Sequence, residues 1–559
     1  MGCTAAVVLG GVALLRRPTV TFHGDLAPVL RTHCAPCHHP GGPAPFPLLH
    51  FEDARARAAQ LADVTARRVM PPWMPEPGCA EFVGDRSLSA DQILLFRRWV
   101  DGGAAEGKSS GPPSPPASTT GWQLGKPDLV VTLPEPYAVP AAGRDLYRNF
   151  VIPLPVASRR FVRAVELLPG NPKVVHHAFL FIDATEESRR LDLRDPEPGF
   201  PGLHVPPSAQ APAGHFLSWQ PGKLSPPPPK DLAWTLEKNC FLVLQIHVSP
   251  SGKPELLQPS VGFHFTPDPP TRTPVKFGLW SSEIDLPAGE RSVVVKDSFT
   301  LPIDVDLLRV LPHAHYLCRR LVGTARLPDG TTRCLIRISD WNFNWQGDYA
   351  YREPIALPRG TVLSMEFTYD NSDANPRNPH QPPRRVRYGL QSADEMAELW
   401  FQAVLRRPED RAILDRENRR KVLLGGVAYN QYLLGLDPDD AKAHAELGKA
   451  WLFLGRPEDA RRHLSTAIRI RPDEDEPHYF LGILCRTERR LEEAAAEFRT
   501  AARLNPRNPK THGNLGLILL ELGRPEDAAA AFEAALRLDP ADEIARDGLA
   551  EAMRARKKD

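Results

Sequence analysis

The feature that most constrains the fold of this chain is a sequence period of 34 residues near its C-terminus. Small residues and prolines recur at this step: Pro438, Pro472, Pro506 and Pro540; Gly448, Gly482 and Gly516; Ala460, Ala494 and Ala528; Ala467, Ala501 and Ala535. Alanines at fixed positions let paired helices pack closely, and each proline follows a helix end that it cannot continue. The period predicts three full repeats over 441–540, with a final helix from Ile544 to Arg556 that caps the stack with its charged outer face.

This period and its small residues resemble the tetratricopeptide repeat family. The resemblance implies a C-terminal α-helical solenoid over 441–559, with a connecting helical segment over 403–440. It also implies a concave face that binds a protein partner. Three histidines recur at the same step: His444, His478 and His512. They occupy a packing position that successive repeats separate, so we expect them to be structural and not metal ligands.

Five histidines of the central region stand in strand-like apolar runs: His176 and His177 in 174–181, His247 in 241–247, and His313 and His315 in 310–317. Residues two apart share one face of a strand, so His313 and His315 can chelate one ion. His176 and His177 point oppositely in a regular strand and can share an ion only where the strand bends or bulges. Imidazole suits copper, and the thioether of Met396 selects Cu(I). These six residues suffice for two copper sites.

These motifs resemble the copper type II, ascorbate-dependent monooxygenases, the family of peptidylglycine α-hydroxylating and dopamine β-monooxygenases. The matching pieces are His-His, Leu-Gln-Ile-His, His-x-His and Asp394-Glu-Met396, which follow the family's order across roughly residues 122–402. The resemblance implies two antiparallel, jelly-roll-like β-sandwich domains, 122–270 and 271–402, facing each other over a wet cleft. It assigns two copper ions: an electron-transfer copper to His176, His177 and His247, and a dioxygen-binding copper to His313, His315 and Met396.

The chain departs from the peptide-hydroxylating members where they hold the substrate carboxylate. Leu311 stands in place of their arginine, and Glu398 and Trp400 stand in place of their asparagine and tyrosine. A glutamate cannot receive a carboxylate at neutral pH, and leucine offers no donor. We therefore expect a small organic substrate other than a peptide carboxylate.

The segment Cys34-Ala-Pro-Cys37-His38 has the c-type haem attachment pattern. The two thiols add to the haem vinyl groups, and the adjacent histidine is placed to ligate the iron. A redox dithiol or half a zinc site is the alternative, but no βαβ pattern surrounds the cysteines and no second Cys-x-x-Cys follows. We expect a covalent haem c in a small helical cytochrome c domain over 18–106.

The distal haem ligand is expected to be a methionine, because a His/Met pair raises the haem potential and suits electron transfer. Met70 is favoured, since its Met-Pro-Pro-Trp sequence resembles that of bacterial fusion cytochromes, and Met74 is the alternative. Export permits disulfides, but the spacing of the other cysteines leaves their pairing open. Cys485 is expected in the core of the second repeat.

Length and charge fit a chain of several domains. Among 559 residues, 69 Lys and Arg balance 68 Asp and Glu, and no basic cluster indicates nucleic-acid binding. Residues 107–121 read as a stiff, Pro/Ser/Gly-rich linker. Residues 1–17 contain an apolar run too short to cross a bilayer, which looks like an export signal or a candidate membrane anchor. Because c-type haem is assembled outside the cytoplasm, we expect a periplasmic or otherwise extracytoplasmic protein.

These motifs together predict a copper-dependent monooxygenase. Dioxygen would hydroxylate a C–H bond, with one oxygen atom leaving as water and two electrons supplied singly through the tethered haem. The first alternative is a non-enzymatic protein that relays electrons or carries copper, with the repeats docking a partner. The second is an assembly scaffold whose metal domains have lost activity.

Overall fold

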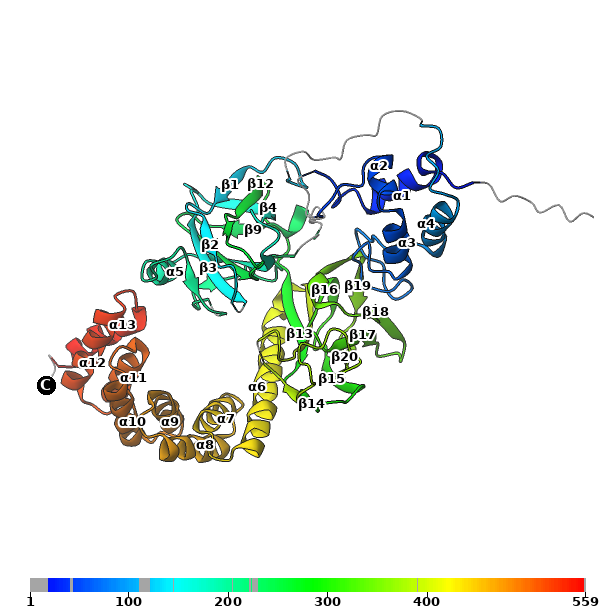
Figure 1. Ribbon diagram of the computed structural model, residues 1–559. Coiled ribbons are helices and arrows are strands. Elements are labelled where there is room, and N and C mark those ends of the chain that lie inside the picture. Colours follow the sequence, from blue (N-terminus) through cyan, green and yellow to red (C-terminus); the bar gives the residue numbers. More distant parts are fainter. Residues whose placement is uncertain are drawn as a thin grey trace, which may run out of the picture.

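The computed structural model describes residues 19–40, 44–109, 121–143, 145–203, 205–220, 223, 230–389 and 391–556. The expected export or anchor segment 1–17 and residues 110–120 of the expected linker lie outside this range. Four regions follow one another: a helical domain, two β units and a curved stack of helices (Figure 1). None of the helices within the described residues is long and apolar enough to span a membrane.

The helical domain is built on a small apolar core. Its elements are η1 (Phe22–Leu26), α1 (Ala27–His33), α2 (Phe51–Arg55), α3 (Ala58–Ala66) and α4 (Ala90–Asp101). Leu26, Phe96 and Trp99 are fully buried among them. The Ser89 side chain accepts a hydrogen bond from the backbone N–H of Gln92 and so caps the N-terminus of α4.

The first β unit, residues 121–266, has two main antiparallel sheets around one core and a small third sheet formed by β2 and β11. One sheet has the order β1-β12-β4-β9 and the other β6-β3-β10-β5-β7, with β8 beside β5. Buried side chains of both sheets form the shared core. Its elements are β1 (Leu129–Thr132), β2 (Tyr137–Val139), β3 (Leu146–Pro153), β4 (Arg160–Leu168), β5 (Val175–Asp183), α5 (Glu187–Asp192), β6 (Phe200–Pro201), β7 (Ala209–Gln210), β8 (Ser218–Trp219), η2 (Lys230–Leu232), β9 (Trp234–Leu236), β10 (Phe241–Val248), β11 (Glu255–Leu257) and β12 (Ser260–Thr266).

The second β unit, residues 275–405, repeats this two-layer plan. Sheets of order β13-β22-β16-β19 and β15-β20-β17-β18 enclose its core. Its last strand continues past the boundary expected at residue 402. The elements are β13 (Val275–Ser281), β14 (Asp285–Leu286), β15 (Val293–Thr300), β16 (Val305–Ala314), β17 (Cys318–Arg326), β18 (Thr332–Ile338), η3 (Phe343–Trp345), β19 (Tyr349–Leu357), β20 (Val362–Tyr369), β21 (Val386–Arg387) and β22 (Ala397–Leu405).

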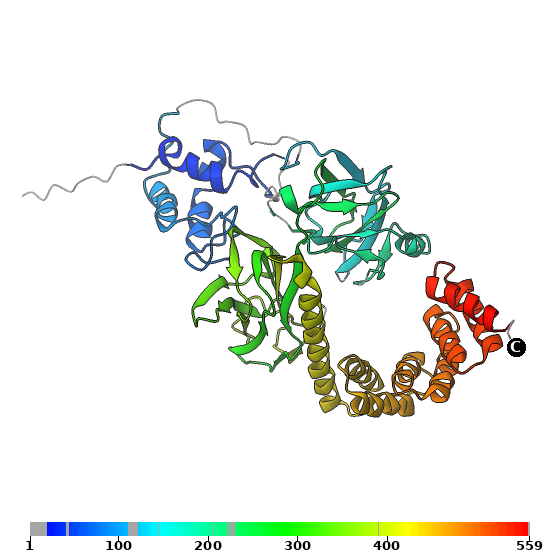
Figure 2. The ribbon, with the colours of Figure 1, turned by 180° about the vertical axis from the view of Figure 1, so that it is seen from behind.

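The helical stack begins with a long helix that packs on the second β unit. Leu414 belongs to the core of that unit, Lys421 Nζ is 2.5 Å from Asp297 Oδ2, and Gly425 lies against the Trp280 ring. The stack then curves away as an arc (Figures 1 and 2). Its helices are η4 (Pro408–Asp410), α6 (Arg411–Leu436), α7 (Ala441–Phe453), α8 (Pro457–Ile470), α9 (Asp475–Thr487), α10 (Leu491–Leu504), α11 (Pro509–Glu521), α12 (Pro525–Leu538) and α13 (Glu543–Ala555).

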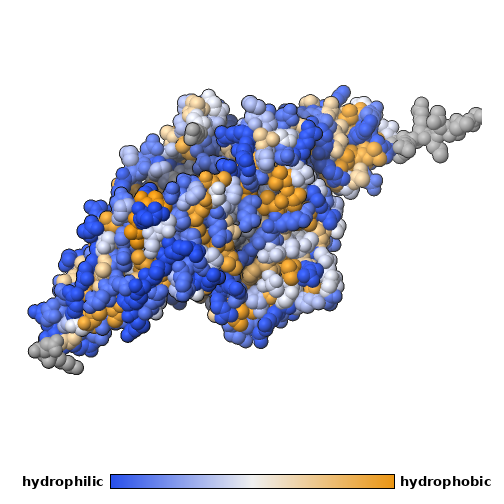
Figure 3. Space-filling model, turned by 90° about the horizontal axis from the view of Figure 1, so that it is seen from below, coloured by the Kyte–Doolittle hydropathy of each residue, from blue (hydrophilic) through white to orange (hydrophobic). Residues whose placement is uncertain are grey.

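The repeating small residues pack as the period predicts. Ala460, Ala494 and Ala528 are fully buried between helices, and Gly516 approaches the Phe532 ring so closely that a Cβ there would clash. Cys485 is buried in the same core, as expected. The face of the molecule seen in Figure 3 is mostly hydrophilic, with separate hydrophobic patches.

Candidate metal centres

The first donor cluster lies where β5 pairs with β10. His177 is opposite His247, but the next residue pair is Val175 with Val248, so His176 is the extra residue of a β-bulge. The bulge turns two adjacent histidines toward one side, as joint coordination requires. The Nδ1 atoms of His176 and His177 are 3.0 Å apart, and one nitrogen of each of the three histidines lies within 4.8 Å of the others.

Asp145 orients the third histidine of this cluster. Its Oδ2 is 3.0 Å from Nε2 of His247. Because a carboxylate only accepts, Nε2 carries the proton and Nδ1 presents a lone pair. That Nδ1 is buried and has no hydrogen-bond partner among the described residues. A buried, orphaned lone pair beside two further imidazoles fits a copper ion.

The second donor cluster lies at the end of β16 and the start of β22. Alternate residues of β16 are buried in the core, so Leu311 and His313 point away from it. The pairing of β16 with β22 places His313 opposite Glu398 and Ala314 opposite Ala397, which brings Met396 beside His315. The two histidine rings are 5.2 Å apart.

Hydrogen bonds turn these two rings the other way from the ring of His247. Nδ1 of His313 is 2.5 Å from Gln346 Oε1, and Nδ1 of His315 is 3.0 Å from the backbone oxygen of Asp394. Both partners are oxygen acceptors, so each Nδ1 carries the proton and each Nε2 keeps its lone pair. Two Nε2 atoms and the 8 % exposed thioether of Met396 form a donor set suited to reduced copper.

A buried carboxylate holds the backbone around this second cluster. Glu395 accepts hydrogen bonds from the backbone N–H groups of His315, Leu317 and Met396. Burial raises the pKa of Glu395 to about 8, although these hydrogen bonds act in the opposite direction. Glu395 therefore ties together the two segments that carry the ligands.

Burial also keeps the histidines in the form that binds metal. It lowers the pKa of His177 well below the ordinary value, helped by the neighbouring imidazoles, and it lowers the pKa of His176. It lowers the pKa of His315 to about 3. Imidazole ligates a metal only when neutral, so these rings are in the required state at physiological pH.

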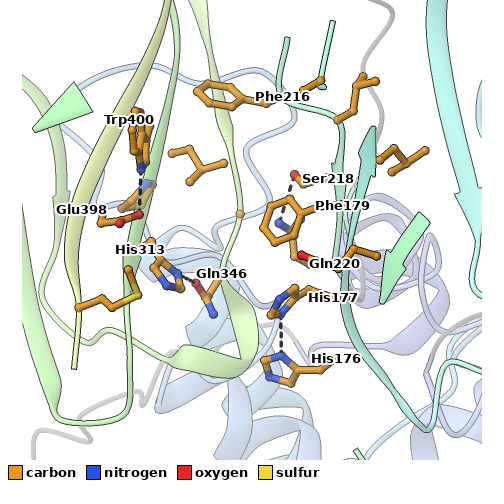
Figure 4. A pocket seen from close by; sticks show the side chains of 18 of the residues that line it. His176, His177, Phe179, Phe216, Ser218, Gln220, His313, Gln346, Glu398 and Trp400 are labelled. Carbon is orange, nitrogen blue, oxygen red and sulfur yellow. Dashed lines mark hydrogen bonds between the residues drawn. The ribbon is translucent and has the colours of Figure 1, made fainter. Parts of the chain in front are cut away.

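Both clusters open into one cavity of about 410 Å³ between the two β units. His176 and His177 enter from the first unit and His313 from the second (Figure 4). Nε2 of His176 is 3.2 Å from Asn344 Oδ1 across the boundary. The structure thus brings five predicted donors to this cavity: His176, His177, His313, His315 and Met396. The sixth, His247, is buried behind His176 and His177.

The rest of the cavity wall is mainly apolar. It includes Leu311 and Trp400, and the Trp400 indole donates to Glu398 at 2.8 Å. A second set of apolar residues comes from β5 and from the segment between β6 and β8 of the first β unit: Phe179, Leu180, Phe181, Leu203, Phe216 and Leu217. The cavity is therefore shaped for a largely apolar molecule.

Lys276 is a cation in this apolar wall. It has no ion pair with any described residue, and burial lowers the pKa of its ammonium group. The nearby cations Arg309 and Lys223, by contrast, both contact Asp348, at 2.6 and 2.5 Å. The Lys276 ammonium instead lies over the Phe216 ring, 5.7 Å from its centroid, and remains available to pair with an anionic group in the cavity.

The haem attachment motif follows α1 of the helical domain. The backbone N–H of His38 donates to the Cys34 oxygen at 2.9 Å, and both cysteines are free thiols. Nδ1 of His38 donates to the Phe46 backbone oxygen at 2.9 Å, which leaves Nε2 as the metal-binding nitrogen. This orientation fits an axial iron ligand.

The two candidate distal methionines differ in their surroundings. Met70 is half-buried at the end of the helical domain. Met74 packs against the core of the second β unit, and its sulfur accepts a hydrogen bond from the Asn342 backbone N–H at 3.2 Å. Met74 is therefore already engaged away from the helical domain.

A disulfide joins the helical domain to the second β unit. It links Cys79 with Cys334, which are 255 residues apart, and so resolves the pairing that the sequence leaves open. Cys240 and Cys318 are buried free thiols. The sequence offers no local signal for this bond, nor for the positions of Asp145, Gln346 and Phe343 beside the predicted ligands.

Comparison with known proteins identifies the helical stack. The tetratricopeptide repeat family matches residues 427–475, 446–509, 481–543 and 514–558, which confirms the repeats and indicates protein-partner binding. Two crystal structures of MamA are similar, at 22 % and 20 % identity with TM-scores of 0.24 and 0.22. Each match covers 26 % of this chain, and 78 % and 94 % of the respective MamA chain. No curated protein matches the chain.

Proposed function

We propose that this protein is a copper-dependent monooxygenase that hydroxylates a C–H bond of a small, largely apolar substrate. The observation that carries the proposal is the meeting of two different donor sets at one cavity. Three imidazoles suit a copper that changes oxidation state while its ligands stay in place. Two imidazoles and a thioether suit a reduced copper that can accept dioxygen.

The overall reaction would consume dioxygen, two electrons and two protons, and would yield the hydroxylated substrate and one water. The two copper ions, when bound, would supply dioxygen activation and one-electron storage. The chain's own part is to hold the ligands and exclude bulk water. Asp145, Gln346 and Glu395 fix the ligand orientations, and the apolar wall places the substrate beside the second cluster.

The proposed substrate has an apolar body and one negatively charged or strongly accepting group. The apolar wall supports the first feature, and the unpaired ammonium of Lys276 supports the second. Such a group would pair with a cation that forms no ion pair with any residue that the structure describes. The family's arginine is absent at Leu311, so this anchor would be specific to this chain.

We further propose that the helical domain is a c-type cytochrome that feeds the copper centres, with Met70 as the distal ligand. The Cys-x-x-Cys-His motif and the orientation of His38 support the haem. The engagement of Met74 with Asn342 supports Met70. Covalent haem attachment would place the protein outside the cytoplasm, and the concave face of the repeats would bind a protein partner there.

Metal analysis and oxygen uptake by protein produced in the periplasm test the proposal. We expect two coppers and one haem that resists acid–acetone extraction, with oxygen uptake coupled to haem oxidation. Met396→Ala should impair oxygen uptake and leave the first copper in place. Zinc in place of copper, extractable haem, or unchanged uptake in Met396→Ala would overturn the proposal, and copper without oxygen uptake would favour an electron relay or copper carrier.

A further inference from the structure

We propose that Phe343 and the chain segment 70–83 form a fixed electron route from the haem to both copper clusters. This inference rests on the proposed function and names the path that it requires. Its basis is a chain of contacts. They join the helical domain to the second β unit, and Phe343 of that unit to one histidine of each cluster.

Segment 73–83 is bound to the second β unit, although it precedes α4 of the helical domain. The backbone N–H of Glu76 donates to the Arg337 oxygen at 2.8 Å, and that of Val83 donates to the Ala350 oxygen at 2.8 Å. Phe82 is 2 % exposed within the core of the second β unit and stacks on Tyr351.

Two further contacts fix the position of this segment. The Cys79–Cys334 disulfide joins it covalently to β18. The Trp73 ring meets the Tyr349 ring edge to face, with centroids 5.4 Å apart. The helical domain is therefore docked at one place and not merely tethered by a linker, which gives a constant donor–acceptor geometry.

A second set of contacts connects Met74 to the clusters. Met74 lies four residues beyond Met70, the proposed axial ligand, and its sulfur accepts a hydrogen bond from the Asn342 backbone N–H at 3.2 Å. Asn342 is bonded directly to Phe343. One hydrogen bond and otherwise covalent bonds thus link the proposed iron ligand to Phe343.

The Phe343 ring lies against one histidine of each cluster. It is 3 % exposed and stacks on His176 with centroids 4.9 Å apart and planes 26° apart. It also meets His315 edge to face at 5.5 Å. Phe343 therefore contacts a ligand from each cluster, and a route through it serves both.

Each passage along this route would move one electron. Ferrous haem would be oxidised to ferric haem as one Cu(II) is reduced to Cu(I), and two passages would supply one turnover. A small reductant such as ascorbate, or a one-electron donor protein, would reduce the haem again. Electrons pass more readily through covalent and hydrogen bonds than across van der Waals gaps, which is why these contacts matter.

The test is the rate of haem oxidation in the full chain, with haem reduced and copper oxidised, measured by stopped flow without dioxygen. Phe343→Leu keeps an apolar side chain but removes the ring, and should slow haem oxidation by about tenfold or more. Phe343→Tyr should restore the rate. The control is the same substitution at Phe299, which lies on β15 and takes no part in the proposed route. Phe299→Leu should not change the rate of haem oxidation.

A second variant keeps the test valid if Phe343→Leu does not fold. Met74→Leu removes the sulfur acceptor and should also slow haem oxidation, while the haem spectrum stays that of a Met70-ligated iron. Unchanged rates in both variants, with copper and haem fully bound, would overturn the route and leave the proposed function standing. A wild-type protein that binds no copper or haem would instead overturn the proposed function.

Discussion

The histidines of the two donor clusters offer different ring nitrogens to a metal: Nδ1 in the first cluster and Nε2 in the second. In the first, Nε2 of His247 donates a hydrogen bond to Asp145, and the Nδ1 atoms of His176 and His177 converge at 3.0 Å. In the second, the Nδ1–H groups of His313 and His315 donate to Gln346 and to the Asp394 backbone oxygen, which leaves the lone pair of each Nε2 free to bind a metal. Nδ1 lies closer to the backbone than Nε2 does. The first cluster is therefore held close to its strands, and the second extends into the cavity.

This difference separates their chemistry. A three-imidazole set close to the sheet has little freedom to rearrange and is suited to storing an electron. A set of two extended imidazoles and a flexible thioether leaves room for dioxygen and favours reduced copper. The variants below test whether the two clusters can be impaired separately, from the largest expected effect to the smallest.

The largest effect is expected from His313→Ala. Loss of one of only three donors should remove copper from the second cluster and abolish oxygen uptake. The first cluster shares no ligand with it and should keep its copper. Copper content by atomic absorption, with oxygen uptake beside it, measures both. Loss of both coppers would show that the clusters depend on each other and are not separate sites.

Asp348→Asn should destabilise the boundary that both clusters share. Asp348 is buried against Lys223 and Arg309, which hold its pKa at about 2. Removing its charge leaves two partly buried cations without their carboxylate partner, at a cost of about 3 kcal/mol of unfolding free energy, the lower end for a buried pair. Urea denaturation measures this cost.

The pH dependence of this contribution follows from the lowered pKa. The ion pairs of Asp348 stabilise the wild-type protein fully above its ordinary pKa near 4. They are lost as the pH falls from there through about 2. The variant should lack this part of the acid dependence. Equal acid dependence in both proteins would contradict the role of Asp348.

The repeats and the clustering of the candidate donors could be predicted from the sequence, but the residues that hold the donors in place could not. The 34-residue period is local, and the expected helix from Ile544 to Arg556 corresponds to α13 within one residue at each end. The motifs named the six candidate metal donors that the structure brings together in two clusters. Asp145 and Gln346 act through pairings between distant strands, and the Cys79–Cys334 bond spans 255 residues, so no local pattern reveals them.

Asp145→Asn should weaken the first cluster selectively. The asparagine can still reach His247, but it no longer favours the tautomer that exposes Nδ1. Loss of such an orienting partner typically lowers metal affinity by about 10–100-fold. Competition with a copper chelator measures the affinity of each site. An equal loss at the second cluster would contradict the assignment, because Asp145 makes no contact there.

The smallest effect is expected from Lys276→Met, which keeps the length of the side chain and removes its charge. No hydrogen bond or ion pair among the described residues joins Lys276 to a predicted ligand, so both coppers, the haem and the rate of haem oxidation should be unchanged. For an apolar substrate with an anionic group, KM should rise by about tenfold, equivalent to about 1.4 kcal/mol of lost binding. For a neutral analogue of the same shape, KM should stay the same or fall, because burial of the unpaired ammonium no longer opposes binding. Equal KM changes for both compounds would mean that Lys276 only shapes the wall. In that case the second cluster, and no charged anchor, would select the substrate.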